Sequence, residues 1–245
     1  MAKYTSDNGD FLVATLQTQT LPTYQENLNY LIEYIENSKA KLIVAPELCL
    51  TNFDYEHFEE AAAFYEIALR SLLRIVSSQI LVLTLTVKEG EDFFNQAIVI
   101  HEHKVIYSQK KYKLFTLGDE EKYFEAGVQA SIVPFEIEGV KYAILICFEL
   151  RFKELWKQIE GVEIVLIPAR WGLSRKKHLE TLSQALAIMN QTFVIVSNSA
   201  DDDMASSSAI ISPWGEVVAD DTVEMIEKKI ALKDVKRVRR LINMN

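Results

Sequence analysis

Short apolar segments alternate with amphipathic ones along the chain, and this alternation restricts the fold more than any other feature of the sequence. Helical periodicity occurs at 23–36, 56–77, 152–159 and 175–190, and a last helix is expected at 233–240. Other segments have the length and apolar content of strands: 11–17, 41–45, 80–87, 95–100, 105–111, 132–137, 142–147, 162–167, 193–198, 209–211 and 224–232. The pattern predicts an α/β fold, and the consecutive strands in the middle suggest two sheets packed face to face. Because no linker or repeat divides the chain, we expect a single domain over residues 1–245.

Local signals predict where some of these elements begin and end. Thr23 and Glu26 have the spacing of a capping box at the start of the first helix. Pro46 and Pro168 each follow an apolar run and are expected to end it. The helix at 175–190 is predicted to bury one stripe, formed by Leu179, Leu182, Leu186 and Met189.

Charge and cysteine content exclude several classes of partner. The formal net charge of −9 argues against nucleic acids and anionic membrane surfaces, which are bound through basic patches. The basic segment 233–240 is interpreted as a terminal helix with cations near its C-terminal end. Two cysteines cannot form a disulfide framework, and no apolar run reaches the roughly 18 residues of a membrane span. We therefore expect a soluble, cytoplasmic protein with no membrane partner.

Motifs for common cofactors are missing from the sequence. None of the eight glycines forms G-x-G, and there is no P-loop pattern. His101 and His103 are two residues apart, but they are expected at a hairpin tip, and no third metal ligand is suggested nearby. We therefore expect neither a cofactor nor a metal.

Three strand ends carry chemically reactive side chains. Glu47 follows the apolar run at 42–45, Lys110 and Lys111 end the strand at 105–111, and Cys147 ends the strand at 142–147. If these strands lie side by side, a carboxylate, an ammonium and a thiol converge at one edge. Each group also has an ordinary structural interpretation: Cys147 as an inert core residue, Glu47 as a turn cap, and the lysines as solvated edge charges.

Together, the three groups would form a coherent catalytic set. The carboxylate can accept the thiol proton, and a nearby ammonium favours the thiolate. Cys147 precedes a predicted helix, whose N-terminal N–H groups favour negative charge. The N–H of Phe148 and the ammonium could then stabilise a tetrahedral oxyanion.

Segments in the same order resemble those of the nitrilase, or carbon–nitrogen hydrolase, superfamily. Residues 45–53 resemble the P-E-L-x-L-T-G-Y segment around the catalytic glutamate, and 147–152 resemble C-Y-D-L-R-F, the nucleophile segment of the amidase-type branches. Residues 111–115 are similar to K-x-H-L-F, which selects Lys111 as the catalytic lysine, and 120–127 to E-x-x-Y-F-x-P-G, which makes Glu120 a second active-site carboxylate. Further similar segments lie at 167–171, 188–191 and 212–217.

The resemblance implies a four-layer α-β-β-α sandwich that pairs through helices into an eight-layer homodimer. It also implies hydrolysis of non-peptide C–N bonds without metal or cofactor. Cys147 would form a thioester with the substrate acyl group, and Lys111 with the Phe148 N–H would hold the oxyanion. Glu47 would act as the base, and Glu120 would orient Lys111 and the substrate.

Departures from the family pattern concern charge near the site. Lys113 stands at the usual histidine, and the arginine and glutamate of R-A-x-E-N are replaced by Leu186 and Met189. Because a lone buried charge is costly, losing both together is easier to tolerate than losing one. The G-H-S segment reads 206–208, Ser-Ser-Ser, so the loop there is expected to differ in shape.

Substrate-binding candidates follow from the same comparison of motifs. Arg170 replaces an asparagine of many amidases; it is either a surface arginine or a clamp for a substrate carboxylate. Trp171 is either a pocket wall or a packing residue. Cys49 is interpreted as a small buried hydrophobe without a role in the chemistry.

The function expected from the resemblance is hydrolysis of a small, carboxylate-bearing amide of the ω-amidase type. A rival within the class is an N-carbamoyl hydrolase that makes β-alanine or a polyamine. An alternative of another class is an inactive relative that acts as a binding or scaffold subunit, motivated by the departures at Lys113, Leu186, Met189 and Ser206.

Overall fold

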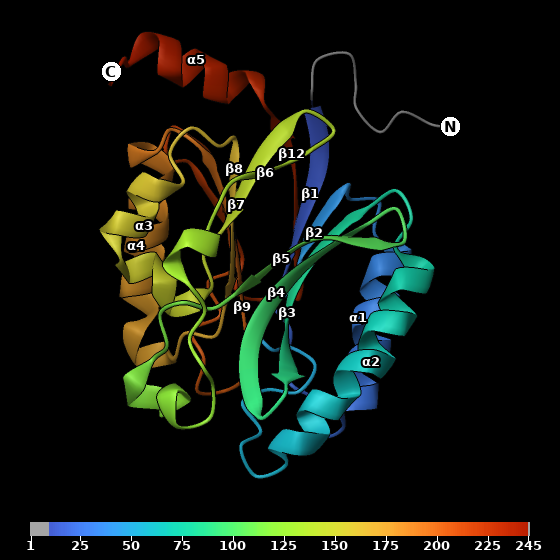
Figure 1. Ribbon diagram of the computed structural model, residues 1–245. Helices are drawn as coiled ribbons and strands as arrows, with labels where there is room; N and C mark the ends of the chain where they lie inside the picture. Colours follow the sequence, from blue (N-terminus) through green and yellow to red (C-terminus); the bar gives the residue numbers. More distant parts are fainter. Residues whose placement is uncertain (1–9, 245) are drawn as a thin grey trace.

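The structure contains two six-stranded sheets and flanking helices (Figure 1). It is a computed structural model, and it describes residues 10–244. The single domain predicted for 1–245 stays a prediction, and residues 1–9 and 245 of that range lie outside the described residues.

The first sheet has the strand order β12-β1-β2-β3-β4-β5. Strands β1, β2 and β3 are parallel to one another, whereas β12, β4 and β5 pair antiparallel with their neighbours. The bounds are β1 Asp10–Leu16, β2 Leu42–Val44, β3 Ile80–Glu89, β4 Asp92–His101, β5 Lys104–Lys110 and β12 Met225–Ala231.

The second sheet has the order β11-β10-β9-β8-β7-β6, with β7, β8 and β9 parallel and the other pairs antiparallel. The bounds are β6 Phe135–Ile137, β7 Val140–Ile144, β8 Ile164–Ala169, β9 Phe193–Asn198, β10 Ala209–Ile211 and β11 Val217–Ala219.

Helices cover the outer face of each sheet (Figure 1). Helices α1 (Tyr24–Asn37) and α2 (Phe58–Ile75) pack on the first sheet, and α3 (Lys153–Gln158) and α4 (Lys176–Met189) lie along the second. A terminal helix, α5 (Lys233–Leu241), follows β12. The layers run helix, sheet, sheet, helix, which confirms the predicted four-layer sandwich. Short 3-10 turns lie at Thr116–Gly118 (η1), Glu120–Lys122 (η2), Gln129–Ser131 (η3), Cys147–Arg151 (η4) and Leu173–Arg175 (η5).

The space between the sheets is filled by aliphatic side chains from both. Val13, Val82 and Val99 of the first sheet belong to the same buried cluster as Ala143 and Leu166 of the second. The apolar alternation along each strand therefore holds the two sheets together and fixes which strand ends meet at the edge between them.

Two sequence-based expectations about strands differ from the structure. Pro168 was expected to end its strand, but β8 continues through it to Ala169. Strand β7 pairs with β8 only as far as Leu166, so Pro168 has one neighbour, β9, and its missing N–H breaks no ladder on the open side. The strand β11 was not predicted, because its residues pair only with the short β10.

The predicted buried stripe of α4 is wrong at its C-terminal end. Leu179 and Leu186 are buried, but Met189 is 56% exposed. Ile188, Trp214 and Val217 are exposed as well, and Ile188 lies against Gly215, the residue after Trp214. The outer face of this end of α4 therefore carries apolar surface.

Within residues 10–244, no helix is both long and apolar enough to cross a bilayer.

Replacing Thr23 by alanine should destabilise the fold. The Thr23 side chain accepts the N–H of Glu26, and the Glu26 carboxylate accepts the N–H of Thr23, so the predicted capping box is present. Its loss should lower the free energy of unfolding by about 1 kcal/mol in urea denaturation. Gln25→Ala, an exposed change in the same turn, is the control; an equal effect of both variants would show that the cap contributes nothing.

Candidate active site

Lys111 bridges two buried carboxylates. Its Nζ lies 2.7 Å from Glu47 Oε1 and 2.6 Å from Glu120 Oε1. The three side chains are almost entirely inaccessible to solvent. Because a buried charge is tolerated only when it is paired, the ammonium and its two carboxylates form one unit.

Glu47 is held at the boundary between the two sheets. It follows β2, and its backbone N–H donates to the Ala169 carbonyl at the end of β8, 3.2 Å away. Asn95 Nδ2 donates to the same Oε1 atom that Lys111 contacts. The other carboxylate oxygen, Oε2, is buried and has no hydrogen-bond partner among the described residues. That oxygen is available to accept a proton.

Glu120 reaches Lys111 from a loop that folds back over β5. It begins the short turn η2, and its second oxygen accepts the N–H of Phe115. The loop returns at Gly127, whose N–H donates to the Lys111 carbonyl. A Cβ at Gly127 would lie 2.5 Å from the Lys110 carbonyl oxygen, so only glycine permits this close approach.

Cys147 is held in a strained backbone conformation. Strand β7 ends at Ile144, and Cys147 opens η4 with φ of +49°, which is unfavourable for a residue with a side chain. Its side chain is 7% exposed, and the Arg170 N–H lies 3.5 Å from Sγ. Such strain concentrates at functional sites, which supports a reactive role for this cysteine.

Electrostatics keep the resting thiol protonated and the lysine charged. Burial raises the pKa of Cys147 well above its ordinary value, and the Glu47 carboxylate adds to the increase. Burial alone would lower the pKa of Lys111, but Glu47 and Glu120 more than compensate and raise it. Burial also raises the pKa of Glu120, with Lys111 opposing this effect. The thiol therefore needs a proton acceptor before it can attack.

The three predicted strand ends converge, but not along one edge of one sheet. Strands β2 and β5 belong to the first sheet with β3 and β4 between them, and β7 belongs to the second sheet. Glu47 and Lys111 contact each other on the first sheet, and the face-to-face packing of the two sheets brings Cys147 beside them. The condition under which convergence was considered, three strands side by side, is therefore not how the structure brings these groups together.

A cavity of about 390 Å³ opens beside these groups. A narrow recess of about 20 Å³ shares Phe115, Cys147, Arg170 and Arg175 with it. The larger cavity is lined by Glu47, Asn52, Phe53, Tyr55, Phe115, Leu117, Gly118, Glu120, Cys147, Arg170, Arg175, Asp201, Asp203 and Met204. Its size and mixed walls suit a small polar molecule.

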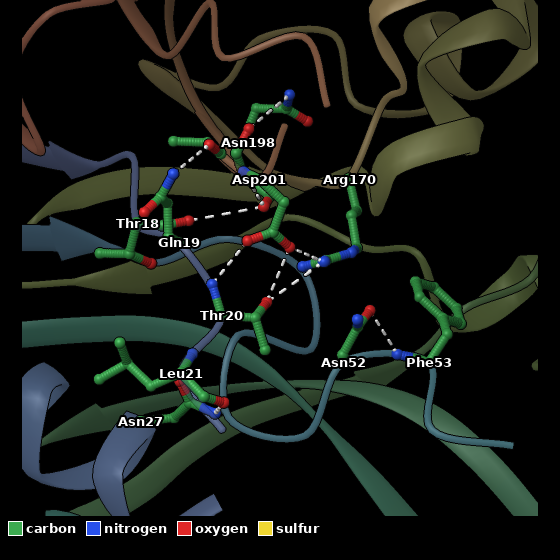
Figure 2. A network of polar contacts seen from close by, with 12 residues as sticks. Thr18, Gln19, Thr20, Leu21, Asn27, Asn52, Phe53, Arg170, Asn198 and Asp201 are labelled. Carbon is green, nitrogen blue, oxygen red and sulfur yellow. Dashed lines mark hydrogen bonds and ion pairs between the residues drawn. The ribbon is translucent and has the colours of Figure 1, made fainter. Parts of the chain in front are cut away.

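Arg170 lines the cavity but is already paired. Its guanidinium forms a very short contact with Asp201 and donates to Thr20 Oγ1 (Figure 2). Asp201 also accepts the backbone N–H of Thr20 at 2.6 Å. Burial raises the pKa of Asp201, but the Thr20 N–H and Arg170 outweigh it and lower the pKa overall. That Arg170 clamps a substrate carboxylate stays a prediction, and Asp201 was not identified from the sequence.

Other predicted residues surround the recess. Trp171 is buried in its wall, with Nε1 unpaired among the described residues, and Arg151 stacks on its ring at 4.5 Å. Phe148, the second residue of η4, also lines the recess, and the oxyanion role of its N–H stays a prediction.

Cys49 does not line the recess. The residue as a whole keeps some exposed surface, but the surroundings of its thiol group bury it enough to raise the thiol pKa to about 12.

The neighbouring lysines lie away from the site. Lys110 pairs with Glu89 at 2.6 Å, and Lys113 lies 3.8 Å from Glu154. Of the three lysines in this segment, only Lys111 contacts Glu47. Within the described part of the chain, no three His, Cys, Asp or Glu side chains gather as a possible metal site.

Glu149 is a buried carboxylate that the sequence did not single out. One oxygen accepts the N–H of Tyr112 and the other the N–H of Ile146, both at 2.7 Å. It therefore ties the residue after Lys111 to the residue before Cys147. Burial raises its pKa to about 7, although the two N–H groups oppose the change. Its position two residues after the cysteine was the only available signal.

Comparisons with known proteins agree on one family. The sequence profile described as Carbon-nitrogen hydrolase matches residues 12–240. A 2-oxoglutaramate amidase of Bacillus subtilis (strain 168) is 32% identical over 220 residues, covering 84% of each chain.

Two solved structures share the fold. Saccharomyces cerevisiae Nit3, a member of branch 10 of the nitrilase superfamily, has a TM-score of 0.84 at 20% identity, covering 100% of this chain and 97% of that one. An amidase from Nesterenkonia sp. AN1, with the acetamide moiety of fluoroacetamide added covalently at its active-site cysteine, has a TM-score of 0.80 at 21% identity, covering 98% and 97%.

Glu149→Gln should flatten the pH dependence of stability. The ordinary pKa is 4.5 and the folded value about 7, so between these pH values the folded state holds more protons than the unfolded state. Stability contributed by this group therefore falls as pH rises from 4.5 to 7, by on the order of 3 kcal/mol. Urea denaturation across this window should show a shallower slope for the variant; Glu36→Gln, at the exposed end of α1, should keep the original slope. Equal slopes for all three proteins would contradict the prediction.

Proposed function

The chain belongs to the carbon–nitrogen hydrolase family, and on that premise we propose that it hydrolyses a small, carboxylate-bearing amide through a thioester on Cys147. As a member it is an amide-hydrolysing enzyme rather than a scaffold subunit. The name of the Bacillus subtilis relative, a 2-oxoglutaramate amidase, supports an ω-amide as the substrate class. The observation that carries the mechanism is the buried Glu47–Lys111–Glu120 unit beside a strained cysteine in an open cavity.

Proton transfer to Glu47 starts the proposed reaction. The Cys147 thiol is protonated at rest, and the unpartnered Oε2 of Glu47 can take its proton as the amide enters. The thiolate then attacks the amide carbon and forms a C–S bond. Lys111, already charged and fixed by Glu120, and the N–H of Phe148 stabilise the oxyanion.

Collapse of the tetrahedral intermediate breaks the C–N bond. Glu47 returns its proton to the departing nitrogen, which leaves as ammonia, and the acyl group remains on sulfur. Glu47 then activates a water molecule, which attacks the thioester and releases the carboxylic acid and the thiol. The sum is amide plus water giving acid plus ammonia. The acetamide moiety bound covalently at the active-site cysteine of the Nesterenkonia amidase supports a nucleophilic thiol at this position.

The two thiols offer a matched test of the nucleophile. Cys147→Ala should abolish ammonia release from an ω-amide such as succinamate, and intact-mass spectrometry should find no acyl adduct. Cys49→Ala should retain activity within about twofold, because burial raises the pKa of that thiol and Cys49 does not line the cavity that Glu47 and Cys147 share. Activity that survives the loss of Cys147, or that falls equally in both variants, would refute the mechanism.

We also propose a homodimer and a reducing, cytoplasmic location. Both cysteines are free, which fits a reducing compartment. Ile188, Met189, Trp214 and Val217 are exposed around the end of α4, and apolar surface of this kind is typical of subunit interfaces. The same face lies on the outer layer of the sandwich, where two copies can pair helix to helix.

Met189→Glu should therefore shift the protein from dimer to monomer in size-exclusion chromatography with light scattering. The added carboxylate would be buried without a partner in the interface. Ile67→Glu is the control, because Ile67 is 51% exposed on the opposite outer layer in α2. A wild-type monomer, or a Met189 variant that still dimerises, would exclude this interface.

A further inference from the structure

Three guanidinium groups line the recess next to Cys147, those of Arg151, Arg170 and Arg175. A chain with a net charge of −9 concentrates positive charge at this point, opposite in sign to its overall charge. Glu47 and Glu120 pair with Lys111 and with none of the three guanidiniums. The three guanidiniums differ in whether a carboxylate of the protein compensates their charge.

Arg170 is compensated within the protein. Its side chain is 5% exposed and pairs with Asp201, and Thr20 hydrogen-bonds to both of them (Figure 2). This network joins the segment after β1 to the ends of β8 and β9. Taking Asp201 away from Arg170 would leave a buried charge unpaired, so a substrate carboxylate gains little by competing for it. Arg170 is better explained as a residue that holds the cavity wall.

Arg175 has no such partner. Among residues 10–244, no carboxylate lies within 4.0 Å of its guanidinium, although Asp203 lines the same cavity. The guanidinium stacks over the Phe115 ring at 5.0 Å, and a Cβ at Gly172 would lie 3.2 Å from its Nη2. Phe115 and Gly172 therefore restrict the position of the group, and Arg175 lines the cavity that Cys147 also lines.

Arg151 adds a second unpaired charge. It stacks on Trp171 and contacts His178 Nδ1 at 3.0 Å, and no carboxylate of the described chain pairs with it. Burial lowers its pKa, and the nearby charge of Arg175 lowers it further. Arg151 lines the narrow recess and Arg175 lines both the recess and the cavity, and two cations that repel each other there are stabilised by a bound anion.

We propose that Arg175, assisted by Arg151, binds the carboxylate of the substrate, and that Arg170 does not. The inference rests on the proposed amide hydrolysis, and it adds the residue that selects carboxylate-bearing amides over neutral ones. The planar guanidinium of Arg175 can hold a carboxylate through two parallel N–H···O bonds while the amide carbon reaches Sγ of Cys147. Arg175 is a binding residue and takes no part in proton transfer.

The test compares Arg175→Gln with wild type on a charged and a neutral amide. For succinamate, ammonia-release kinetics should show KM raised at least about tenfold, since a charge-assisted bidentate contact is lost. Hydrolysis of butyramide, which lacks the carboxylate, should change less than twofold. Arg175→Lys keeps the positive charge but loses the paired N–H donors of the planar guanidinium, and it should give an intermediate KM for succinamate. Arg74→Gln, an exposed arginine on α2, is the control and should behave as wild type.

Binding of succinate, measured by isothermal titration calorimetry, separates this inference from the catalytic proposal. Succinate that binds wild type and is weakened at least tenfold by Arg175→Gln supports the carboxylate site, even if no amide is turned over. The inference would be overturned if Arg175→Gln hydrolysed succinamate with an unchanged KM and bound succinate with unchanged affinity. The proposed amide hydrolysis would still stand in that case. Equal losses for succinamate and butyramide, or a wild type that neither binds succinate nor hydrolyses succinamate, would overturn it as well.

Discussion

The buried ion cluster of Lys111 with Glu47 and Glu120 is the constraint on which the rest of the site depends. An ammonium removed from water is costly, and only the two carboxylates at 2.6–2.7 Å make it tolerable. Their pairing leaves the cluster with one excess negative charge, which opposes ionisation of the neighbouring thiol. The same arrangement leaves one oxygen of Glu47 without a partner. In the proposed reaction, the charge that keeps the nucleophile protonated at rest is therefore also the charge that removes its proton.

Face-to-face packing of two sheets brings Cys147 to this cluster. Glu47 and Lys111 both follow strands of the first sheet, with β3 and β4 between them, whereas Cys147 follows β7 of the second. The Glu47 N–H reaches across to the Ala169 carbonyl of the second sheet, and Glu149 joins the backbone after Lys111 to the backbone before Cys147. The aliphatic core between the sheets thus supplies most of the positioning, and these polar contacts set the final register.

Much of this arrangement was readable from the sequence, because strand ends, caps and family motifs are local signals. The identity of the catalytic lysine could not be predicted from the local sequence. Along K-K-Y-K, successive residues point to opposite sides of the chain, and the charged residues on either side do not indicate which side is buried. Family resemblance selected Lys111, and the contacts of Lys110 with Glu89 and of Lys113 with Glu154 agree. The Arg170–Asp201 pair and the passage of β8 through Pro168 depend on the lengths of neighbouring strands, which no single segment encodes.

Acidic and basic side chains both line the cavity, and in the proposed reaction they give the amide a direction. The acidic end, with Glu47 and Glu120, must exclude a substrate carboxylate by like-charge repulsion, because Lys111 is already surrounded. In the proposed site, Arg175, which lines the same cavity, and Arg151, which lines the adjoining recess, attract it, in a protein whose net charge of −9 repels anions at long range. A substrate with a carboxylate at one end and an amide at the other can then enter in only one productive orientation, with the amide at Cys147. Orientation by repulsion as well as attraction is a strong form of selectivity. A substrate bound in the reversed orientation would lack the attraction of its carboxylate to the arginines and would also place that carboxylate against Glu47 and Glu120.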